Sequence, residues 1–428
     1  MKFIPHVDSA VYDDFVRQHP QKSHFMQSLA WGEFCSAEKG LTPLYVGLAA
    51  DDGGLAAAAL LLERKPPLFP PYLYAPRGYV VDFGDAPLLA EFTRHIRAFA
   101  KSRGDMFVKI DPDVERRAVD DHGRQLEGGF NNEAVVERLK ALGYRHHGWN
   151  MGFEGSQPRF TFRIDLTRSE KEIEKGIVGN VMKNVRKSHN YATSVVHGTS
   201  ADVPTLHRLI GITSERDAFV GYGESYYQHF YDILSKHDMA TLYLGRVDPA
   251  ATVAMLRKEL DALLEKRPSI TREGPRNESL LSEARLLREI AQFEDYAARY
   301  PDGATVSAHL VVRYGDKAWA VHAGSDKLMS ETFINNRVYY EKLMEAKASG
   351  AKLLDQFGTV GNPDDSPLKS LHEFKKQFGG RYVEFIGEFD LVLRPFWYFI
   401  YEKILPVYRN IRIDWKLRKN ARPGAREK

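Results

Sequence analysis

The most regular pattern of apolar and polar positions in this chain lies between residues 250 and 299. Apolar side chains recur at spacings of three and four in two runs, which contain Val253, Leu256, Leu260 and Leu263, and then Leu286, Ile290, Phe293 and Ala297. This spacing is typical of amphipathic helices, and Pro268, Gly274 and Pro275 separate the two runs. We therefore expect an antiparallel helical hairpin, with arms roughly 25–30 Å long at ~1.5 Å per residue, that projects from the protein.

Shorter elements alternate on both sides of this hairpin. Before residue 165, strand patterns at 45–48, 55–62 and 106–110 accompany helical patterns at 87–103 and 135–142. After it, helical patterns at 169–189 and 204–216 accompany strand patterns at 241–247, 304–314 and 318–322. This mixture predicts an α/β (α+β) protein with two similar units. We expect one domain at 1–165, a second at 166–395 interrupted by the arm at 250–299, and a tail at 396–428.

One lysine departs from the apolar pattern. On a helix that the Gly379–Gly380 pair ends, Leu371, Phe374 and Phe378 share one face, and Lys375 falls within the same arc. Its neighbour Lys376 points away, as a solvated lysine does. Lys375 either snorkels from the edge of a core or carries its ammonium into a cleft, and periodicity leaves both interpretations open.

Charge is distributed unevenly along the 428 residues. The 60 Lys and Arg against 57 Asp and Glu give a net +3, so the whole molecule is not a basic nucleic-acid binder. Nine basic and three acidic side chains nevertheless give the tail at 396–428 a charge of +6, beside several aromatic residues. Such a tail fits a segment resting on an anionic bilayer, and a docked terminal helix followed by a charged disordered end is the more ordinary interpretation.

Several classes of site are absent from the sequence. It has no nucleophile elbow, P-loop, H-E-x-x-H, C-x-x-C pair or G-x-G-x-x-G, and its histidines lack the spacing of metal ligands. The single cysteine, Cys35, excludes an internal disulfide and fits a reducing compartment. With no signal peptide and no run of about 18 apolar residues, we expect a cytoplasmic protein, at most peripheral at the inner membrane face, without a metal.

Six short motifs occur in an order that resembles a known family. They are Gln27-Ser28-x-x-Trp31, Tyr74-Ala75-Pro76-Arg77-Gly78, Val108-Lys109-Ile110-Asp111-Pro112, Asn184-Val185-Arg186-Lys187, Thr213-x-x-Arg216 and Phe374-Lys375-x-x-Phe378-Gly379. Together they resemble the Fem family of aminoacyltransferases, which build peptidoglycan interpeptide bridges. The resemblance implies two tandem GNAT-like acyltransferase domains with an inserted helical arm. It also implies aminoacyl-tRNA as the co-substrate, with no other cofactor.

The resemblance implies an acceptor and roles for individual residues. The acceptor is lipid II or UDP-MurNAc-pentapeptide, and the basic aromatic tail and the arm favour lipid II. Lys375 would stabilise the oxyanion or bind the 3′ end of the tRNA, and Phe374 would shape the acceptor slot. Asp111 would orient the incoming amine, although an Asp-Pro pair is also an ordinary turn starter. Arg216 would hold the phosphate of the acceptor.

Further residues are expected to bind the two substrates. Trp31, Tyr74 and Arg77 would line the groove for the muropeptide, although ordinary aromatic packing also explains Trp31. Lys183, Arg186 and Lys187, with Arg272 and Arg276 at the tip of the arm, would contact tRNA, although a solvated helix face also explains such charges. Two other functions remain open: a GNAT-fold transferase acting on another amine, and a non-catalytic protein that binds tRNA as a scaffold.

Overall fold

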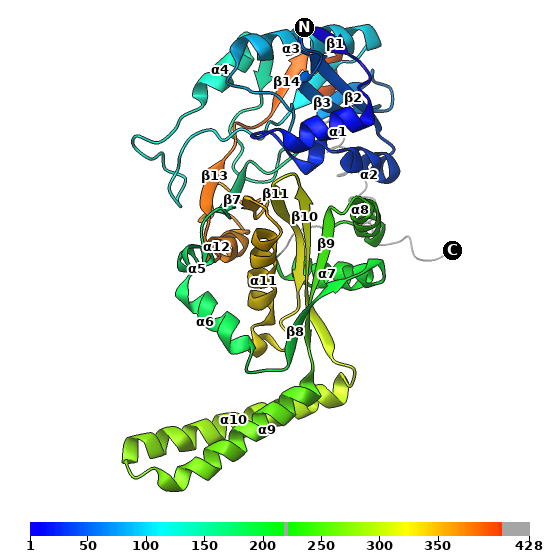
Figure 1. The fold of residues 1–428 in the computed structure, drawn as a ribbon. Helices are drawn as coiled ribbons and strands as arrows, with labels where there is room; N and C mark the ends of the chain where they lie inside the picture. Colours follow the sequence, from blue (N-terminus) through cyan, green and yellow to red (C-terminus); the bar gives the residue numbers. More distant parts are fainter. Residues whose placement is uncertain (218–220, 405–428) are drawn as a thin grey trace, which may run out of the picture. The chain divides into compact units, whose positions relative to one another are not determined.

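The computed structural model describes residues 1–217 and 221–404. Two compact units divide the chain, and each is built on its own seven-stranded sheet (Figure 1). Unit 1 comprises residues 1–118, 127–159 and the chain from Glu384 onward, and unit 2 comprises residues 119–126 and 160–383. The predicted tail therefore lies mostly outside the described residues.

The sheet of unit 1 has the strand order β1-β2-β3-β4-β5-β14-β6. These strands are β1 Lys2–Ile4, β2 Thr42–Ala49, β3 Leu55–Arg64, β4 Tyr72–Ala75, β5 Phe107–Ile110, β14 Phe389–Val392 and β6 Tyr144–His146. Only the β4–β5 pair is parallel. The main helices are α1 Ser9–Gln18, α2 Leu29–Lys39, α3 Ala86–Arg103 and α4 Glu133–Ala141. Apolar residues of α3 and α4 pack on the buried side chains of the sheet and form its core.

The sheet of unit 2 has the order β13-β7-β12-β11-β10-β9-β8. The strands are β7 Phe160–Asp165, β8 Thr193–Gly198, β9 Ala240–Val247, β10 Ala304–Tyr314, β11 Lys317–Ser325, β12 Leu353–Asp355 and β13 Arg381–Glu384. The helices are α5 Glu170–Gly176, α6 Gly179–Ser188, α7 Val203–Asp217, α8 Glu224–Lys236, α11 Ile334–Ala348 and α12 Lys369–Gln377. The β11 and β12 strands run parallel, with α11 as the connection between them.

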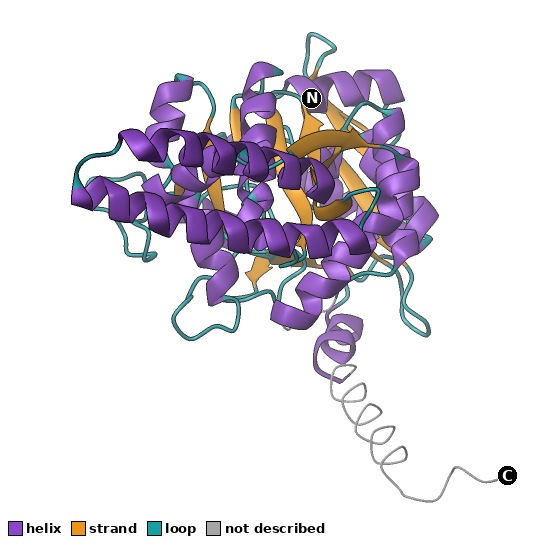
Figure 2. Cartoon of the chain, turned by 90° about the horizontal axis from the view of Figure 1, so that it is seen from below, coloured by secondary structure: helices purple, strands orange, loops and turns teal. Residues whose placement is uncertain are grey.

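The predicted helical hairpin is present in unit 2. It consists of α9 Pro249–Lys266 and α10 Glu273–Arg299, which lie side by side (Figure 2). Asp248 caps α9 by accepting a hydrogen bond from the amide of Ala251 at 2.9 Å. The apolar stripes of both helices join the core of unit 2 through buried residues at the base of the arm; these are Val253, Leu256, Leu286, Ile290 and Phe293.

The structure differs from the predicted boundaries in several places. Residues 119–126 and 160–165, expected in the first domain, belong to unit 2. The segment 384–395, expected in the second domain, supplies β14, which pairs with β5 and β6 in the sheet of unit 1. Periodicity identifies a strand but carries no information on its partner, because pairing is non-local. The helical stretch at 169–189 is two helices, α5 and α6, separated by Ile177 and Val178. In residues 1–217 and 221–404, no helix is long and apolar enough to cross a membrane.

Candidate functional site

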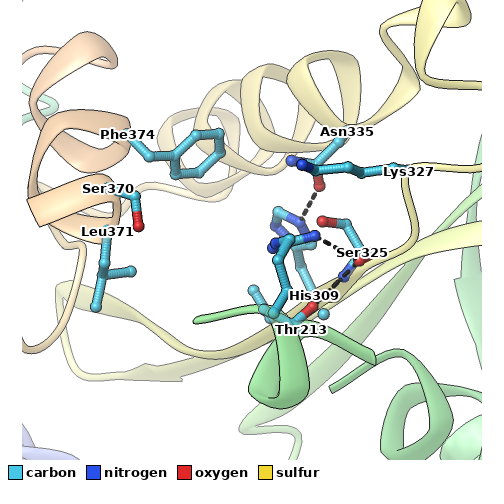
Figure 3. A pocket seen from close by; sticks show the side chains of 11 residues that line it. Thr213, His309, Ser325, Lys327, Asn335, Ser370, Leu371 and Phe374 are labelled. Carbon is cyan, nitrogen blue, oxygen red and sulfur yellow. Dashed lines mark hydrogen bonds between the residues drawn. The ribbon is translucent and has the colours of Figure 1, made fainter. Parts of the chain in front are cut away.

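A cavity of about 380 Å³ opens in unit 2 between α7, α11, α12 and the sheet (Figure 3). Side chains from all four elements line it: Thr213, Arg216, His309, Ala323, Gly324, Ser325, Lys327, Asn335, Ser370, Leu371 and Phe374. Phe374 projects from α12 toward Asn335 and Lys327 on the opposite wall. Two residues predicted for the site, Arg216 and Phe374, are therefore brought to one cavity.

A glycine allows α7 to approach β11 at this cavity. A Cβ on Gly324 would lie 2.4 Å from the backbone nitrogen of Ile210 and from the carbonyl carbon of Leu209. Only a residue without a side chain fits there. The close approach lets Thr213 Oγ1 accept from the amide of Ser325 at 2.9 Å, while Nη1 of Arg216 donates to the carbonyl of Ser325 at 3.2 Å. The helix end that carries Arg216 is thereby fixed to the end of β11.

The cavity has cations and hydroxyls at its mouth and an aromatic ring on one wall. Arg216 and Lys327 are both exposed, Ser325 accepts from Arg216 through its carbonyl, and Ser370 lines the wall formed by α12 (Figure 3). Guanidinium and ammonium groups bind phosphate oxygens through charge-assisted hydrogen bonds, and an aromatic face stacks on a base. This arrangement can hold an anionic ligand that carries a ring.

The floor of the cavity continues into a buried polar chain. Nε2 of His309 lies 3.0 Å from Oδ1 of Asn335, and its Nδ1 lies 2.9 Å from Nζ of Lys342. His309 and Lys342 are each only 1% exposed. Burial, reinforced by Lys342, lowers the pKa of His309 well below its usual value, and burial, reinforced by Lys375, lowers the pKa of Lys342. Both shifts disfavour the charged forms of the His309 and Lys342 side chains.

Lys375 is placed differently from its neighbour Phe374. Its ammonium turns inward and donates to the carbonyls of Phe357 at 2.7 Å and Gly358 at 2.6 Å. Burial lowers its pKa to about 7, partly opposed by the carboxylate of Asp355. Lys375 therefore does not snorkel toward solvent, and it is not among the residues that line the cavity.

Three predicted residues of unit 1 form a second buried cluster. Asp111, 3% exposed, accepts from the hydroxyl of Tyr74 at 2.8 Å and from the amide of Arg77 at 2.6 Å. Burial raises the pKa of the Asp111 carboxyl to about 7, against the lowering effect of Arg77. Arg77 has a positive φ of 54° and stacks its guanidinium 4.5 Å from the centroid of Phe385. This cluster presents a carboxyl group poised near neutral pH.

The other predicted residues are dispersed. Trp31 is buried on α2, with its ring 5.4 Å from Phe25 and 5.1 Å from Phe34, as its packing interpretation expected. The predicted tRNA contacts are exposed on two elements of unit 2: Lys183, Arg186 and Lys187 on α6, Arg276 on α10, and Arg272 at the start of α10. Within the described ranges, no group of three or more His, Cys, Asp or Glu side chains could hold a metal.

Sequence reasoning missed His309, Lys327, Asn335 and Lys342. Lys342 had the same signal as Lys375, because it is a lysine on the buried face of α11 with Val338, Tyr339, Leu343 and Ala346. His309 gave no such signal, since a histidine within a buried strand is ordinary.

Comparisons with known proteins agree over nearly the whole chain. A model of the FemAB family matches residues 7–404. A lipid II:glycine glycyltransferase of Staphylococcus haemolyticus (strain JCSC1435) is 29% identical over 425 residues, which cover 95% of this chain and 97% of that protein. Its counterpart in Staphylococcus aureus (strain COL) is 29% identical, covering 97% and 99%. The crystal structure of FemX matches with a TM-score of 0.76 at 27% identity, over 94% of this chain and all of that one.

Proposed function

The chain belongs to the FemAB family, and from this premise we propose that it moves an amino acid from aminoacyl-tRNA to an amine of lipid II. It is an aminoacyltransferase of peptidoglycan bridge synthesis, with the predicted fold of two tandem GNAT-like domains and an inserted arm. Its similarity to lipid II:glycine glycyltransferases over 95% or more of the chain supports the proposed acceptor. Membership of this class of enzymes excludes the alternative of a non-catalytic scaffold that only binds tRNA.

The observation that carries the proposed donor is the composition of the cavity in unit 2. Arg216 and Lys327 supply cations for the terminal phosphates of a tRNA, and Phe374 supplies a ring for its last base. The exposed basic residues of α6 and of the arm then contact the rest of the tRNA through its backbone. In this proposal Arg216 binds phosphate, as the family resemblance implied, but the phosphate belongs to the donor.

The reaction itself requires little catalytic machinery. Converting an activated ester to an amide is downhill, so positioning and charge stabilisation carry most of the rate. Lys375 is proposed to stabilise the oxyanion or the tRNA end, for which its ammonium must turn from the carbonyls of Phe357 and Gly358 toward the cavity. Asp111, held by Tyr74 and Arg77, is proposed to orient the incoming amine. Aminoacyl-tRNA is the only co-substrate that this scheme requires.

Peripheral contact with the inner face of the membrane follows from a lipid-linked acceptor. Phe396 and Phe399 on α13 (Pro395–Phe399) are 70% and 59% exposed, and the +6 tail continues beyond them. Exposed aromatics beside basic residues bind anionic lipid surfaces. Liposome flotation compares the full chain with one truncated at residue 395. Undiminished binding after truncation contradicts this part of the proposal.

Transfer of a radiolabelled amino acid tests the function directly. The protein is incubated with a mixture of charged tRNAs and either lipid II or UDP-MurNAc-pentapeptide, with and without RNase. The proposal expects an RNase-sensitive mass shift of lipid II that identifies the amino acid. Transfer to UDP-MurNAc-pentapeptide alone would show that the acceptor is this soluble precursor and not lipid II. Transfer to neither, with activity on another amine, would favour the alternative GNAT-fold transferase.

A further inference from the structure

Lys342 and His309 place two basic side chains, each 1% exposed, in contact within the core of unit 2. Lys342 lies on the core face of α11, with its ammonium nitrogen 3.6 Å from the centroid of the Tyr339 ring. In the part of the chain that the structure describes, no carboxylate forms an ion pair with it. A methionine would fill the same space without burying a polar group, and a buried amine without a carboxylate partner is costly to keep.

The pair connects this amine to the wall of the cavity. Nζ of Lys342 meets Nδ1 of His309, and Nε2 of His309 meets the side chain of Asn335, which also accepts from the hydroxyl of Ser307 at 2.8 Å. His309 and Asn335 both line the cavity (Figure 3). The polar chain therefore runs from the ligand space to a nitrogen that solvent does not reach.

The hydrogen bonds that join Lys342, His309 and Asn335 can be donated in either direction along the series. A neutral amine both donates and accepts, and a half-turn of Asn335 exchanges its oxygen for its amide nitrogen. The ring of His309 can consequently hold its single proton on Nδ1 or on Nε2 without leaving a buried group unpaired. Proton transfer between the ends of a hydrogen-bonded series requires that every donor and acceptor in it can be reversed, and this series meets that requirement.

Resting on the proposed function, we propose that His309 and Lys342 form a proton relay for the amine that attacks the ester. The acceptor enters as an ammonium and loses two protons. Its nitrogen bonds to the ester carbon, and the bond from that carbon to the ribose oxygen breaks. In this step the amine takes the place of the Asn335 side chain at Nε2 of His309. One proton then passes to Nε2 while Nδ1 passes its own proton to Lys342, and the return of this proton protonates the leaving ribose oxygen. The second proton goes to solvent, so the reaction balances.

The surroundings favour a relay that returns its proton. The titratable and charged groups facing it are Tyr339 on α11, Lys375 on α12 with Asp355 on β12, and the cavity cations Arg216 and Lys327. Burial and neighbouring positive charge lower the pKa of both His309 and Lys342, so a protonated Lys342 gives its proton to the leaving oxygen more readily than an ordinary ammonium does. In this scheme His309 is the catalytic residue, and Lys342 acts through it.

Single-turnover transfer measured from pH 6 to 9 tests the relay in Lys342→Met and His309→Gln. Both variants should lose about 10²-fold or more in rate while the affinity for charged tRNA stays within twofold, and imidazole should restore part of the rate in His309→Ala. Tyr339→Phe is the matched control, because it removes only the bond from its hydroxyl to Gln356. Rates within threefold of wild type in folded Lys342→Met overturn the proposal.

A second measurement keeps the relay testable apart from the overall function. Nuclear magnetic resonance of side-chain nitrogen, with Lys342→Arg or His309→Gln as the assignment variant, reports the charge of Lys342 in the intact protein. The relay requires a neutral Lys342 at pH 7.5, and a charged one overturns it whether or not transfer is seen. A wild-type protein that transfers nothing, yet holds Lys342 neutral, contradicts the proposed function but not the relay geometry.

Discussion

The hydroxyl of Tyr74 donates to the carboxyl group of Asp111 at 2.8 Å, inside a cluster where that carboxyl is 3% exposed. The second oxygen of Asp111 accepts from the amide of Arg77, so both oxygens are occupied by donors of unit 1. Burial outweighs these donors, and the pKa of about 7 places the titration of Asp111 in the physiological range.

Replacing Asp111 with Asn should make stability less dependent on pH. The folded-state pKa of Asp111 is raised, so its contribution is full below the unfolded value near 4 and is lost as pH rises through about 7. Asn keeps an acceptor for Arg77 and a donor for Tyr74 but never ionises. The midpoint of thermal unfolding of Asp111→Asn should therefore rise relative to that of the wild type between pH 5 and pH 8. A constant difference over that range contradicts a titrating carboxyl here.

Lys375→Met should abolish most transfer while Lys376→Met does not. Lys376 is the matched control, because it is the adjacent lysine and its side chain is 30% exposed. Its ion pair with Asp121, 3.5 Å between Nζ and Oδ2, contributes little to stability. Loss of an oxyanion donor costs about 10²-fold in kcat. Rates with charged tRNA and lipid II, together with tRNA affinity, make the comparison. Equal rates in the two variants remove Lys375 from the reaction.

Arg216→Met should weaken the binding of the donor without changing the fold. One charge-assisted contact to phosphate is worth about 1.5–3 kcal/mol, so KM for charged tRNA should rise roughly 10-fold or more. Arg208→Met is the control on the same helix, because its guanidinium donates to the carbonyl of Thr305 and lies outside the cavity. If KM for lipid II rises in place of KM for tRNA, the phosphate belongs to the acceptor.

Gly324→Ala should separate α7 from β11. The new Cβ would lie 2.4 Å from backbone atoms of α7, which cannot move as a flexible side chain can. Overpacking of this kind costs about 1–3 kcal/mol, and the Thr213–Ser325 contact should be lost with it. Gly211→Ala, on α7 with nothing within 4 Å of its Cβ, should be neutral or stabilising. Denaturant unfolding and KM for charged tRNA report the two effects.

Salt dependence should distinguish the two basic surfaces of unit 2. Each phosphate contact adds roughly 0.7–0.9 to the slope of log affinity against log salt. Changing Lys183, Arg186 and Lys187 together to Gln should flatten this slope if α6 contacts tRNA. The same experiment with Arg272 and Arg276 tests the arm. If both variants keep the wild-type slope, the basic residues of α6 and of the arm are ordinary solvated side chains that do not contact tRNA.

Local patterns predicted the arm and the position of Lys375 on the apolar face of its helix, because a 3.6-residue period can be recognised in a sequence without knowing the fold. The cavity was not predictable in this way. It depends on the approach of α7 to β11 through Gly324, and on His309 and Lys342 meeting across 33 residues of chain. The inward turn of the Lys375 ammonium likewise depends on carbonyls at residues 357 and 358, which no helical pattern on α12 contains.

The position of β14 in the first sheet has a consequence for biosynthesis. This strand lies between β5 and β6, yet among the strands that the structure describes it is the last to leave the ribosome. Unit 2 can complete its sheet once residue 384 has emerged, while the N-terminal unit still holds two open strand edges. The sheet whose first strands are synthesised earliest is therefore completed last, and its unpaired strand edges expose the nascent chain to incorrect pairing until β14 has emerged.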